Sequence, residues 1–360
     1  MNMNIYGVVM AGGIGARFWP LSRQKIPKQF LNLTGNKQMI NESIERLSNI
    51  VNKNNIFIVT NKEQVSEVIK VTAGDIKQQN ILIEPESKNT AACIGYAAIE
   101  IVKKYSDGIM VITPSDHYIK DVCEFSKVLN IAVKIAEKTN KLLTIGIKPT
   151  FPSTGFGYIK FEDKNIKGIN HVLEFHEKPD EENAKKYIES GNYVWNSGMY
   201  IWKASTILKK FEEYTPDIYD GLVKIGDVIG TDIEEKIISS IYACIPNISI
   251  DYAVMESSAL EGDVLVIPAE FGWNDVGSWN VMDVLNIPDS SGNVLIGDTL
   301  AIDVSDTVIY SSGRTVTAVG VENLIIVETS DAIMVCQKNK AQDVKKIVNI
   351  LEKENRIELL

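Results

Sequence analysis

The chain opens on the stretch that decides its fold, Ile5-Tyr6-Gly7-Val8-Val9-Met10-Ala11-Gly12-Gly13-Ile14-Gly15-Ala16-Arg17-Phe18-Trp19-Pro20-Leu21-Ser22-Arg23. Its first part is an apolar, partly β-branched run, which predicts a buried strand. The run breaks into glycines, where the backbone can approach a ligand more closely than any Cβ would allow. Arg17, Arg23 and Lys28 follow closely, and clustered cations of this kind can bind a polyphosphate. The stretch therefore predicts a strand followed by a phosphate-binding turn.

This glycine turn differs from two commoner nucleotide-binding loops. A P-loop has Lys followed by Ser or Thr directly after its last glycine, whereas Gly15 is followed by Ala16-Arg17. The dinucleotide fingerprint needs a third small residue, and Phe18 stands at that position. An ordinary strand and turn would require the glycines and all the basic residues to coincide by chance.

Length and composition limit the class of protein. The 360 residues suggest one large domain and a smaller one, and 45% hydrophobic residues with 23% charged residues are ordinary for a soluble protein. A net charge of −10 argues against a nucleic-acid partner, because phosphate backbones are bound by excess Lys and Arg. Met1 to Asn4 lack the layout of a signal peptide, and no apolar run is long enough to span a membrane. We therefore expect a cytoplasmic protein with no membrane partner.

The four cysteines are widely separated and form no Cys-x-x-Cys pair. This spacing favours neither a disulfide framework nor a zinc site. We expect all of them to be buried or half-buried thiols, namely Cys93, Cys123, Cys244 and Cys336.

Short apolar runs alternate with amphipathic segments through the first half of the chain. We expect further strands at 56–59, 80–83 and 109–112, and helices that begin near residues 40 and 65. The alternation predicts right-handed βαβ crossovers and a mixed, mostly parallel sheet flanked by helices. Ligands bind such sheets at the carboxyl ends of the strands.

Polar residues follow the third and fourth of these strands. Asn89 and Thr90 precede a helix of small residues, so capping is their simplest role. Asp116 comes directly after the fourth strand, where a carboxylate suits Mg²⁺, an ion that prefers hard oxygen ligands. The alternative for Asp116 is to cap the next helix, although Asp121 is better placed to do so.

From Pro149 the segments become longer and look antiparallel, which is typical of a substrate-binding insertion. Gly157 stands at the start of a strand, where a sugar ring could lie against bare backbone. A later strand ends in Glu177-Lys178-Pro179, and the bend that Pro179 imposes allows both charged side chains to face one pocket. Charge alone would favour a solvated hairpin tip. Asn196 offers a donor and an acceptor to a pair of hydroxyl groups.

Helices are expected from about 205 to 258, and Asp251 in this region either caps its helix or lines the sugar site.

Asp275 follows in a loop rich in Gly and Trp. An aspartate in a tight turn usually stabilises the turn, but Trp273 and Trp279 around Asp275 favour a rigid functional loop. Past Asp283, short runs separated by Gly, Asp and Asn predict a small β-solenoid, followed by a final helix from Ala341.

Together, Ala11-Gly12-Gly13-x-Gly15-x-Arg17-x-Trp19-Pro20-Leu21-Ser22-Arg23 and Pro27-Lys28-Gln29 resemble the signature of bacterial mannose-1-phosphate guanylyltransferases, which are sugar-nucleotide pyrophosphorylases. Ala16 and Phe18 depart from the commoner residues of that signature, but neither position supplies a charge. Later motifs extend the resemblance over essentially the whole chain. It implies a nucleotidyltransferase domain over 1–285, Rossmann-like and GT-A-like, with a sugar-binding insertion at about 149–204. It also implies a cap over 286–360 that resembles a left-handed β-helix and can form a homodimer contact.

The resemblance implies that GTP and α-D-mannose 1-phosphate react to give GDP-mannose and pyrophosphate. The implied catalytic residues are Arg17, Lys28, Asp116 and Asp275, and the two aspartates would hold Mg²⁺. The implied nucleotide-binding residues are Ala11, Gly12, Gly13, Gly15, Arg17, Lys28, Glu84, Asn89, Thr90, Ser115 and Asp116. The implied sugar-phosphate-binding residues are Gly157, Glu177, Lys178 and Asn196.

Two other functions fit the same sequence less well. One is a sister enzyme that uses another sugar 1-phosphate or another base. The other is a non-catalytic subunit that senses sugar nucleotides, which the joint presence of Arg17, Lys28, Asp116, Lys178 and Asp275 disfavours. Some longer relatives append an isomerase domain, and we do not expect that second activity in this chain.

Overall fold

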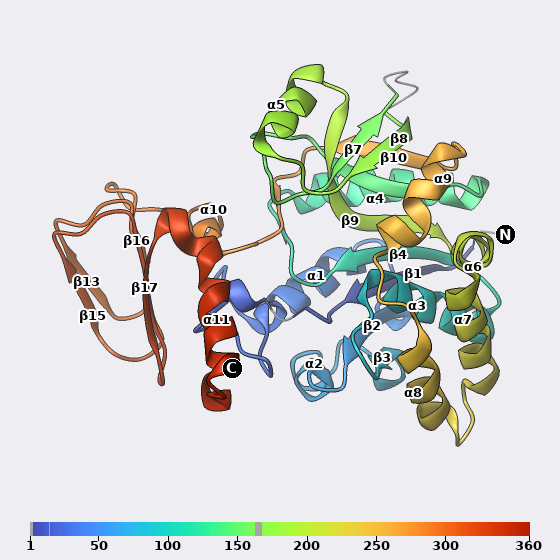
Figure 1. The fold of residues 1–360 in the computed structure, drawn as a ribbon, viewed down its shortest axis with the longest axis horizontal. Helices are drawn as coiled ribbons and strands as arrows, with labels where there is room; N and C mark the ends of the chain where they lie inside the picture. The colour runs from blue at the N-terminus through green and yellow to red at the C-terminus, as the bar shows by residue number, and fades with distance from the viewer. Residues whose placement is uncertain (1–2, 14, 163–167) are drawn as a thin grey trace. The chain divides into compact units, whose positions relative to one another are not determined.

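The computed structural model describes residues 3–13, 15–162 and 168–360 (Figure 1). Ile14 of the glycine turn and residues 163–167 of the expected insertion lie outside the described residues. The chain forms two compact units. The first unit comprises Met1–Gly12, Ser43–Ser115 and Ile119–Trp273, and the second comprises Gly13–Glu42, Asp116–Tyr118 and Asn274–Leu360. Gly13 and Gly15 of the glycine turn thus group with the C-terminal region, whereas Gly12 belongs to the first unit. The domain boundary near 285 stays a prediction.

A nine-stranded mixed sheet forms the centre of the first unit, in the order β3-β2-β1-β4-β9-β6-β10-β8-β7. β8 and β9 run opposite to the other strands of this sheet. The three strands expected after the first are confirmed, although the strand expected at 80–83 begins at Ile81. The strands are β1 (Ile5–Met10), β2 (Ile56–Asn61), β3 (Ile81–Glu84), β4 (Ile109–Pro114), β6 (Leu142–Ile147), β7 (Tyr158–Phe161), β8 (Asn170–His176), β9 (Tyr193–Lys203) and β10 (Val264–Ala269).

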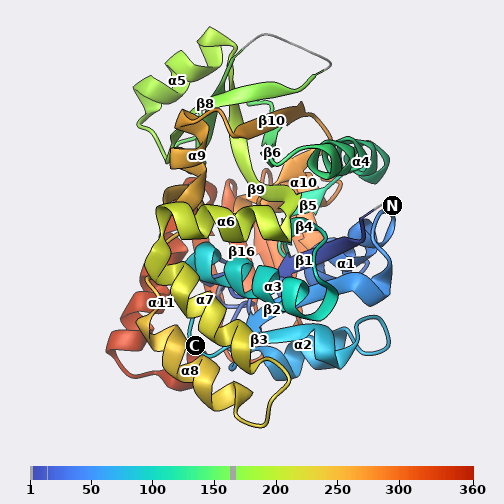
Figure 2. The same cartoon turned by 90° about the vertical axis from the view of Figure 1, so that its right-hand side faces the viewer.

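Helix α3 is the most buried helix of this unit, because its small residues let it lie close to the sheet and to α6 and α7 (Figure 2). Asp121 caps α4, accepting a hydrogen bond from the Glu124 amide at 2.9 Å, as expected. The helices that precede β10 are α1 (Met39–Ser48), α2 (Val65–Val71), α3 (Asn89–Tyr105), α4 (Val122–Lys138), α5 (Glu181–Ser190), α6 (Ala204–Tyr214), α7 (Pro216–Val228), α8 (Glu234–Cys244) and α9 (Glu256–Leu260).

The C-terminal part of the second unit is made of short, mostly parallel strands. They form a four-stranded sheet, β12-β14-β16-β17, and a two-stranded sheet, β13-β15, and β16 and β17 pair antiparallel. All the expected rungs are present, as β12 (Val294–Ile296), β13 (Thr299–Ile302), β14 (Val308–Ser311), β15 (Val316–Val319), β16 (Leu324–Glu328) and β17 (Ile333–Gln337). Successive strands stacked in this way give a β-helix-like domain. Two short strands, β5 (Tyr118–Ile119) and β11 (Trp273–Asn274), also pair.

The residues after the glycine turn belong to the hydrophobic core of the second unit. Phe18 and Trp19 are buried with Trp279 and with helix α11 (Val344–Lys353), while α10 (Met282–Leu285) supplies Met282. The Trp279 indole donates to the Trp19 carbonyl at 3.1 Å. The turn is therefore fixed to C-terminal elements of the same unit.

Two expectations about the cysteines are wrong. Cys93 is buried and Cys336 is half-buried, but Cys123 and Cys244 are exposed. Both exposed residues lie on helices, where only the face that packs against the core is covered. Among the described helices, none is long and apolar enough to cross a membrane.

Candidate functional site

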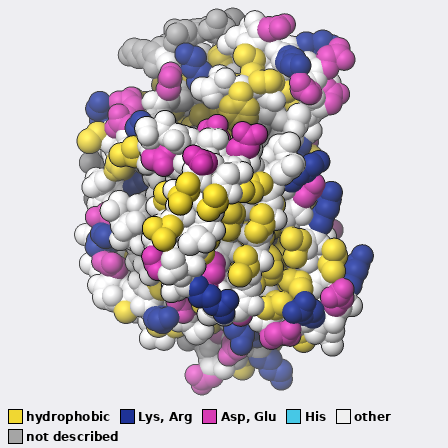
Figure 3. All heavy atoms as spheres, turned by 90° about the vertical axis from the view of Figure 1, so that its left-hand side faces the viewer, with side chains coloured by type: hydrophobic (Ala, Val, Ile, Leu, Met, Phe, Trp, Pro, Cys, Tyr) yellow, Lys and Arg dark blue, Asp and Glu magenta, His cyan; other side chains and the backbone are white. Residues whose placement is uncertain are grey.

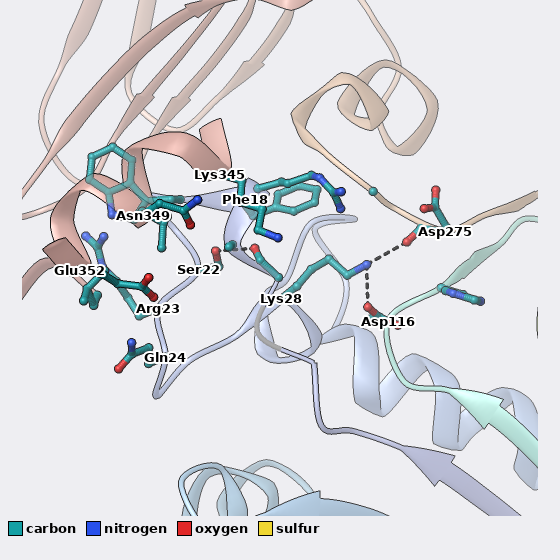
Figure 4. Close-up of a pocket in the computed structure, with 18 residues that line it drawn as sticks. Phe18, Ser22, Arg23, Gln24, Lys28, Asp116, Asp275, Lys345, Asn349 and Glu352 are labelled. Carbon is teal, nitrogen blue, oxygen red and sulfur yellow. Dashed lines mark hydrogen bonds and ion pairs between the residues drawn. The ribbon is translucent and has the colours of Figure 1, made fainter. Parts of the chain in front are cut away.

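Lys28 is the centre of a charged cluster in the second unit (Figure 4). Its side chain is 6% exposed, and its Nζ lies 2.7 Å from Oδ2 of Asp116. The same Nζ donates to the backbone carbonyls of Asp275 at 2.8 Å and Val276 at 3.0 Å. Three segments far apart in the sequence thus meet at one ammonium group.

Gly15 allows this close approach. It has a φ of +64°, and a Cβ at this position would overlap the Lys28 side chain. The glycine is therefore required both by the backbone conformation and by the packing of Lys28. Gly13, by contrast, has open space around it.

The pKa values of the two aspartates of the cluster are shifted in opposite directions. Burial raises the pKa of Asp116, but Lys28 and His117 outweigh it and hold the pKa below its ordinary value. Burial holds the pKa of Asp275 above its ordinary value, although Lys28 and Arg17 act against it. Asp116 is thus the more readily ionised of the two carboxyl groups.

The cluster opens into a cavity of about 620 Å³ within the same unit. Arg17 lines it, as expected of a phosphate-binding residue, and helix α11 contributes Lys345, Asn349 and Glu352, which the sequence did not single out. Arg23 also lines the cavity, but its guanidinium is bound to Asp331 at 2.6 Å and to the Leu359 carbonyl at 2.9 Å. Arg23 therefore fastens the turn to the C-terminal region.

The donor set of the cluster fits a magnesium ion. Asp116 and Asp275 each contribute a carboxylate to the lining of the cavity, and the described residues contain no group of three or more His, Cys, Asp or Glu side chains that could hold a metal alone. Mg²⁺ usually binds one or two carboxylates and completes its shell with phosphate oxygens and water. Two aspartates in the cavity that Gly15 and Arg17 also line are consistent with that pattern.

Glu84 and Gly12 lie together in the first unit, after strands β3 and β1. A Cβ on Gly12 would lie 3.8 Å from Oε2 of Glu84. Glu84 is 5% exposed and accepts a hydrogen bond from the Tyr242 hydroxyl at 3.1 Å. Burial raises the pKa of Glu84 to about 7, although the bond from Tyr242 lowers it. Tyr242 was not expected from the sequence, because it is 158 residues away.

Asn89 and Thr90 do not cap α3 in the ordinary way. Asn89 has a φ of +66°, and its side chain accepts from the adjacent Thr90 amide at 2.8 Å. The Thr90 hydroxyl accepts from the Ile250 amide at 2.8 Å and so connects α3 to the segment before α9.

Two other expected nucleotide-binding residues lie at the ends of strands and take part in backbone hydrogen bonds. Ser115 is buried, and its amide donates to the Met10 carbonyl at 3.0 Å. The Ala11 amide donates to the Val59 carbonyl at 2.8 Å.

A second cavity, of about 420 Å³, lies in the first unit and brings the four residues of the expected sugar site together. A Cβ on Gly157 would lie 2.8 Å from Oε2 of Glu177, so a side chain at this position would require the Glu177 carboxylate to move. Lys178 forms an ion pair with Glu177, and its φ of +44° places it in a turn. Asn196 completes the set. The bend at Pro179 thus allows neighbouring charges to line one cavity.

Asp251 lines this cavity and organises its polar wall. Its Oδ1 accepts from Asn196 Nδ2 at 3.0 Å and from the Tyr200 hydroxyl at 2.8 Å. Burial raises the pKa of Asp251, although both donors act against it. The sequence left two roles open for Asp251, and the structure places it at the cavity. Other lining residues that the sequence missed include His176, Tyr252 and Glu256.

Comparisons with known proteins show the family to which the chain belongs. Residues 6–285 match the Nucleotidyl transferase family, and residues 297–351 match the MannoseP isomerase/GMP-like beta-helix domain. A mannose-1-phosphate guanylyltransferase of Salmonella montevideo is 40% identical, over 98% of this chain and 74% of the relative. The alginate biosynthesis protein AlgA of Pseudomonas syringae pv. tomato is 36% identical, over 98% of this chain and 72% of the relative.

A solved structure has a similar fold over nearly the whole chain. It is described as a mannose-1-phosphate geranyltransferase from Thermus thermophilus and is 31% identical to this chain, with a TM-score of 0.87. The match covers 97% of this chain and 100% of that one. The resemblance found in the sequence therefore extends to the structure.

Glu84 should make the stability of the protein depend on pH. Because its folded pKa of about 7 lies above the ordinary 4.5, the stability it confers is present below pH 4.5 and is lost as pH rises through about 7. We expect Glu84→Gln to remove a fall of about 3 kcal/mol in unfolding free energy over this range. Urea unfolding at several pH values measures the difference between the two proteins. Glu86→Gln, at a half-exposed neighbour, is the control, and an unchanged pH slope in Glu84→Gln would contradict the assignment.

Proposed function

This chain belongs to the nucleotidyl transferase family, and we propose that it makes GDP-mannose and pyrophosphate from GTP and α-D-mannose 1-phosphate. The name of the Salmonella relative supports the choice of base and sugar. The observation that carries the proposal is the buried Lys28, which brings the glycine turn, Asp116 and Asp275 to one point. A polyphosphate-handling enzyme needs this combination of cation and carboxylates.

The proposed reaction needs little acid–base catalysis from the protein. The phosphate of mannose 1-phosphate is already a nucleophile at neutral pH, so its oxygen forms a bond to the α-phosphorus of GTP. The bond from that phosphorus to the β-phosphate oxygen breaks, and pyrophosphate leaves with the electron pair. Catalysis then depends on positioning and on neutralising charge, which Arg17 and Lys28 can provide.

In this proposal the first cavity binds the triphosphate, which lies against Gly15, Arg17 and Lys28. The nucleoside contacts Glu84, Asn89 and Thr90, of which Asn89 lines the second cavity. The sugar phosphate takes the cavity of Gly157, Glu177, Lys178 and Asn196. Asp251 fixes the Asn196 amide so that its carbonyl oxygen can accept from a sugar hydroxyl.

Asp116 and Asp275 are the residues that would hold Mg²⁺. The bound ion would neutralise phosphate charge during the transfer. Lys28 shares the same carboxylate, Asp116, and so keeps that ligand in place. His117, next to Asp116, adds to the positive surroundings.

Our proposal also includes the fold type of each unit, the oligomeric state and the cellular compartment. It assigns the first unit to the GT-A-like, Rossmann-like type and gives the β-helix-like domain a left-handed winding. It makes the protein a cytoplasmic homodimer. The exposed apolar side chains of the β13-β15 face support a contact between copies, and Figure 3 shows hydrophobic atoms gathered there; they include Leu300, Ile302 and Val319.

A screen of pyrophosphate release tests the function directly. We expect the fastest release with GTP and mannose 1-phosphate, and we expect it to require a divalent ion. UTP, dTTP and ATP crossed with glucose 1-phosphate and mannose 1-phosphate are the comparison reactions. Equal or faster turnover of another pair would assign the chain to a sister enzyme, and GDP-mannose binding without turnover would indicate a sensing subunit.

The metal assignment predicts the behaviour of two variants. Asp116→Asn and Asp275→Asn should each lower kcat by about 10²- to 10³-fold, since each removes one charged group that acts in the transition state. Thermal unfolding and a kcat measurement at saturating Mg²⁺ separate a catalytic loss from a folding defect. Asp121→Asn, at the cap of α4, is the matched control and should keep kcat. A near-normal kcat in either site variant would remove that residue from the metal site.

The last pair of variants separates the two phosphate sites. Lys178→Ala should raise KM for mannose 1-phosphate about tenfold or more, because a charge-assisted contact is worth roughly 1.5 to 3 kcal/mol. Lys28→Ala should instead impair the use of GTP and lower kcat. Both KM values are measured for each variant. An unchanged mannose 1-phosphate KM in Lys178→Ala would mean that the Glu177-Lys178 tip is only a solvated turn.

A further inference from the structure

A third cavity, of about 640 Å³, lies in the first unit along β3, which is an edge strand of the large sheet. Helix α3 and the beginning of α8 form its other sides, and Figure 2 shows these elements close together. None of the described residues that line it also lines either cavity discussed above. It has the volume of an ordinary small-molecule site.

A buried carboxylate faces this cavity without a full set of partners. Glu100 of α3 lines the cavity and is 1% exposed. One of its oxygens, Oε1, pairs with Lys104 one turn further along the helix. The other, Oε2, is buried and has no hydrogen-bond partner among the described residues. A buried oxygen left in this state is destabilising, so a ligand that donates to it would recover free energy.

One side of the cavity near Glu100 is apolar. Ile81 and Ile83 come from the edge strand, and Ile238 comes from α8. Ile83 is 38% exposed although it belongs to a strand of the main sheet. Tyr96 lies one turn before Glu100 on the same face of α3 and adds a ring to the wall. A ligand with a flat or aliphatic body would cover this surface.

The charges of the lining select a cation. The carboxylates are those of Glu100, Asp232, Glu234 and Glu235, against the ammonium groups of Lys62 and Lys104. Lys62 lies 3.8 Å from Glu235, and Lys104 pairs with Glu100. The lining therefore keeps an excess of negative charge, which attracts a positively charged ligand.

We propose that this cavity binds a small amphipathic cation, whose amidinium, guanidinium or ammonium N–H donates to Oε2 of Glu100 and whose apolar body packs against β3 and α8. The site is separate from the proposed synthesis of GDP-mannose and does not depend on it. Its ligand is defined by two features of the cavity, the unpartnered carboxylate oxygen and the apolar walls.

Isothermal titration of the full chain with benzamidine tests the proposal, since this probe joins an amidinium fork to an apolar ring. We expect saturable binding in the millimolar range. Benzamide has the same shape without the charge and should bind at least tenfold more weakly. The same titration in the presence of GTP should give the same affinity, because the site is separate.

Variants connect the binding to Glu100. Glu100→Gln keeps the size of the side chain and should weaken benzamidine binding about tenfold, whereas Glu235→Gln at the rim should change it much less. Ile83→Trp leaves the charge unchanged and should block the cavity, so it tests the site if Glu100→Gln fails to fold. Near-UV circular dichroism checks the fold of each variant. Equal binding of benzamide, full affinity in both Glu100→Gln and Ile83→Trp, or no binding by the wild-type chain would overturn the proposal.

Discussion

The second unit depends on one buried ammonium group. Lys28 is almost fully enclosed, and it is stabilised there by the Asp116 carboxylate and by two backbone carbonyls of the Asp275 loop. A buried charge is tolerated only when it is paired and hydrogen-bonded, so these contacts fix the loop and the turn together. Gly15 is part of the same constraint, because any side chain there would collide with Lys28. The residues assigned to phosphate and metal binding are thus held by the packing that folds this unit.

The second cavity, in the first unit, is likewise organised around a charged group that has hydrogen-bond partners. Asp251 is half-buried and accepts two hydrogen bonds, one from Asn196 and one from Tyr200. Because the Asn196 amide donates to Asp251, its orientation is fixed. Glu177 lies against Gly157 in the same cavity. The sugar phosphate that we propose for this cavity would therefore meet polar groups that are already oriented, and a small change in their geometry would change which sugar fits best.

Glu100 differs from the two aspartates in one respect. Asp116 and Asp251 are half-buried and their carboxylates have ion-pair or hydrogen-bond partners, whereas one oxygen of the buried Glu100 has none among the described residues. Its cavity lies beside the edge strand, where the sheet offers no further strand to cover it. The unpartnered oxygen of Glu100 is therefore the feature that marks this third cavity as a candidate binding site.

The sequence alone determined the elements and most of the candidate residues. Local patterns sufficed for the strands, for the Asp121 cap and for the short rungs after Asp283, because periodicity and capping act between near neighbours in the chain. Only the tertiary structure decided which residues meet. Arg23 looked like a phosphate ligand but is bound to Asp331, and Tyr242 reaches Glu84 across 158 positions. Contacts of this kind depend on the packing of distant segments, and burial and pairing are set by that packing, so no local pattern in the chain could have specified them.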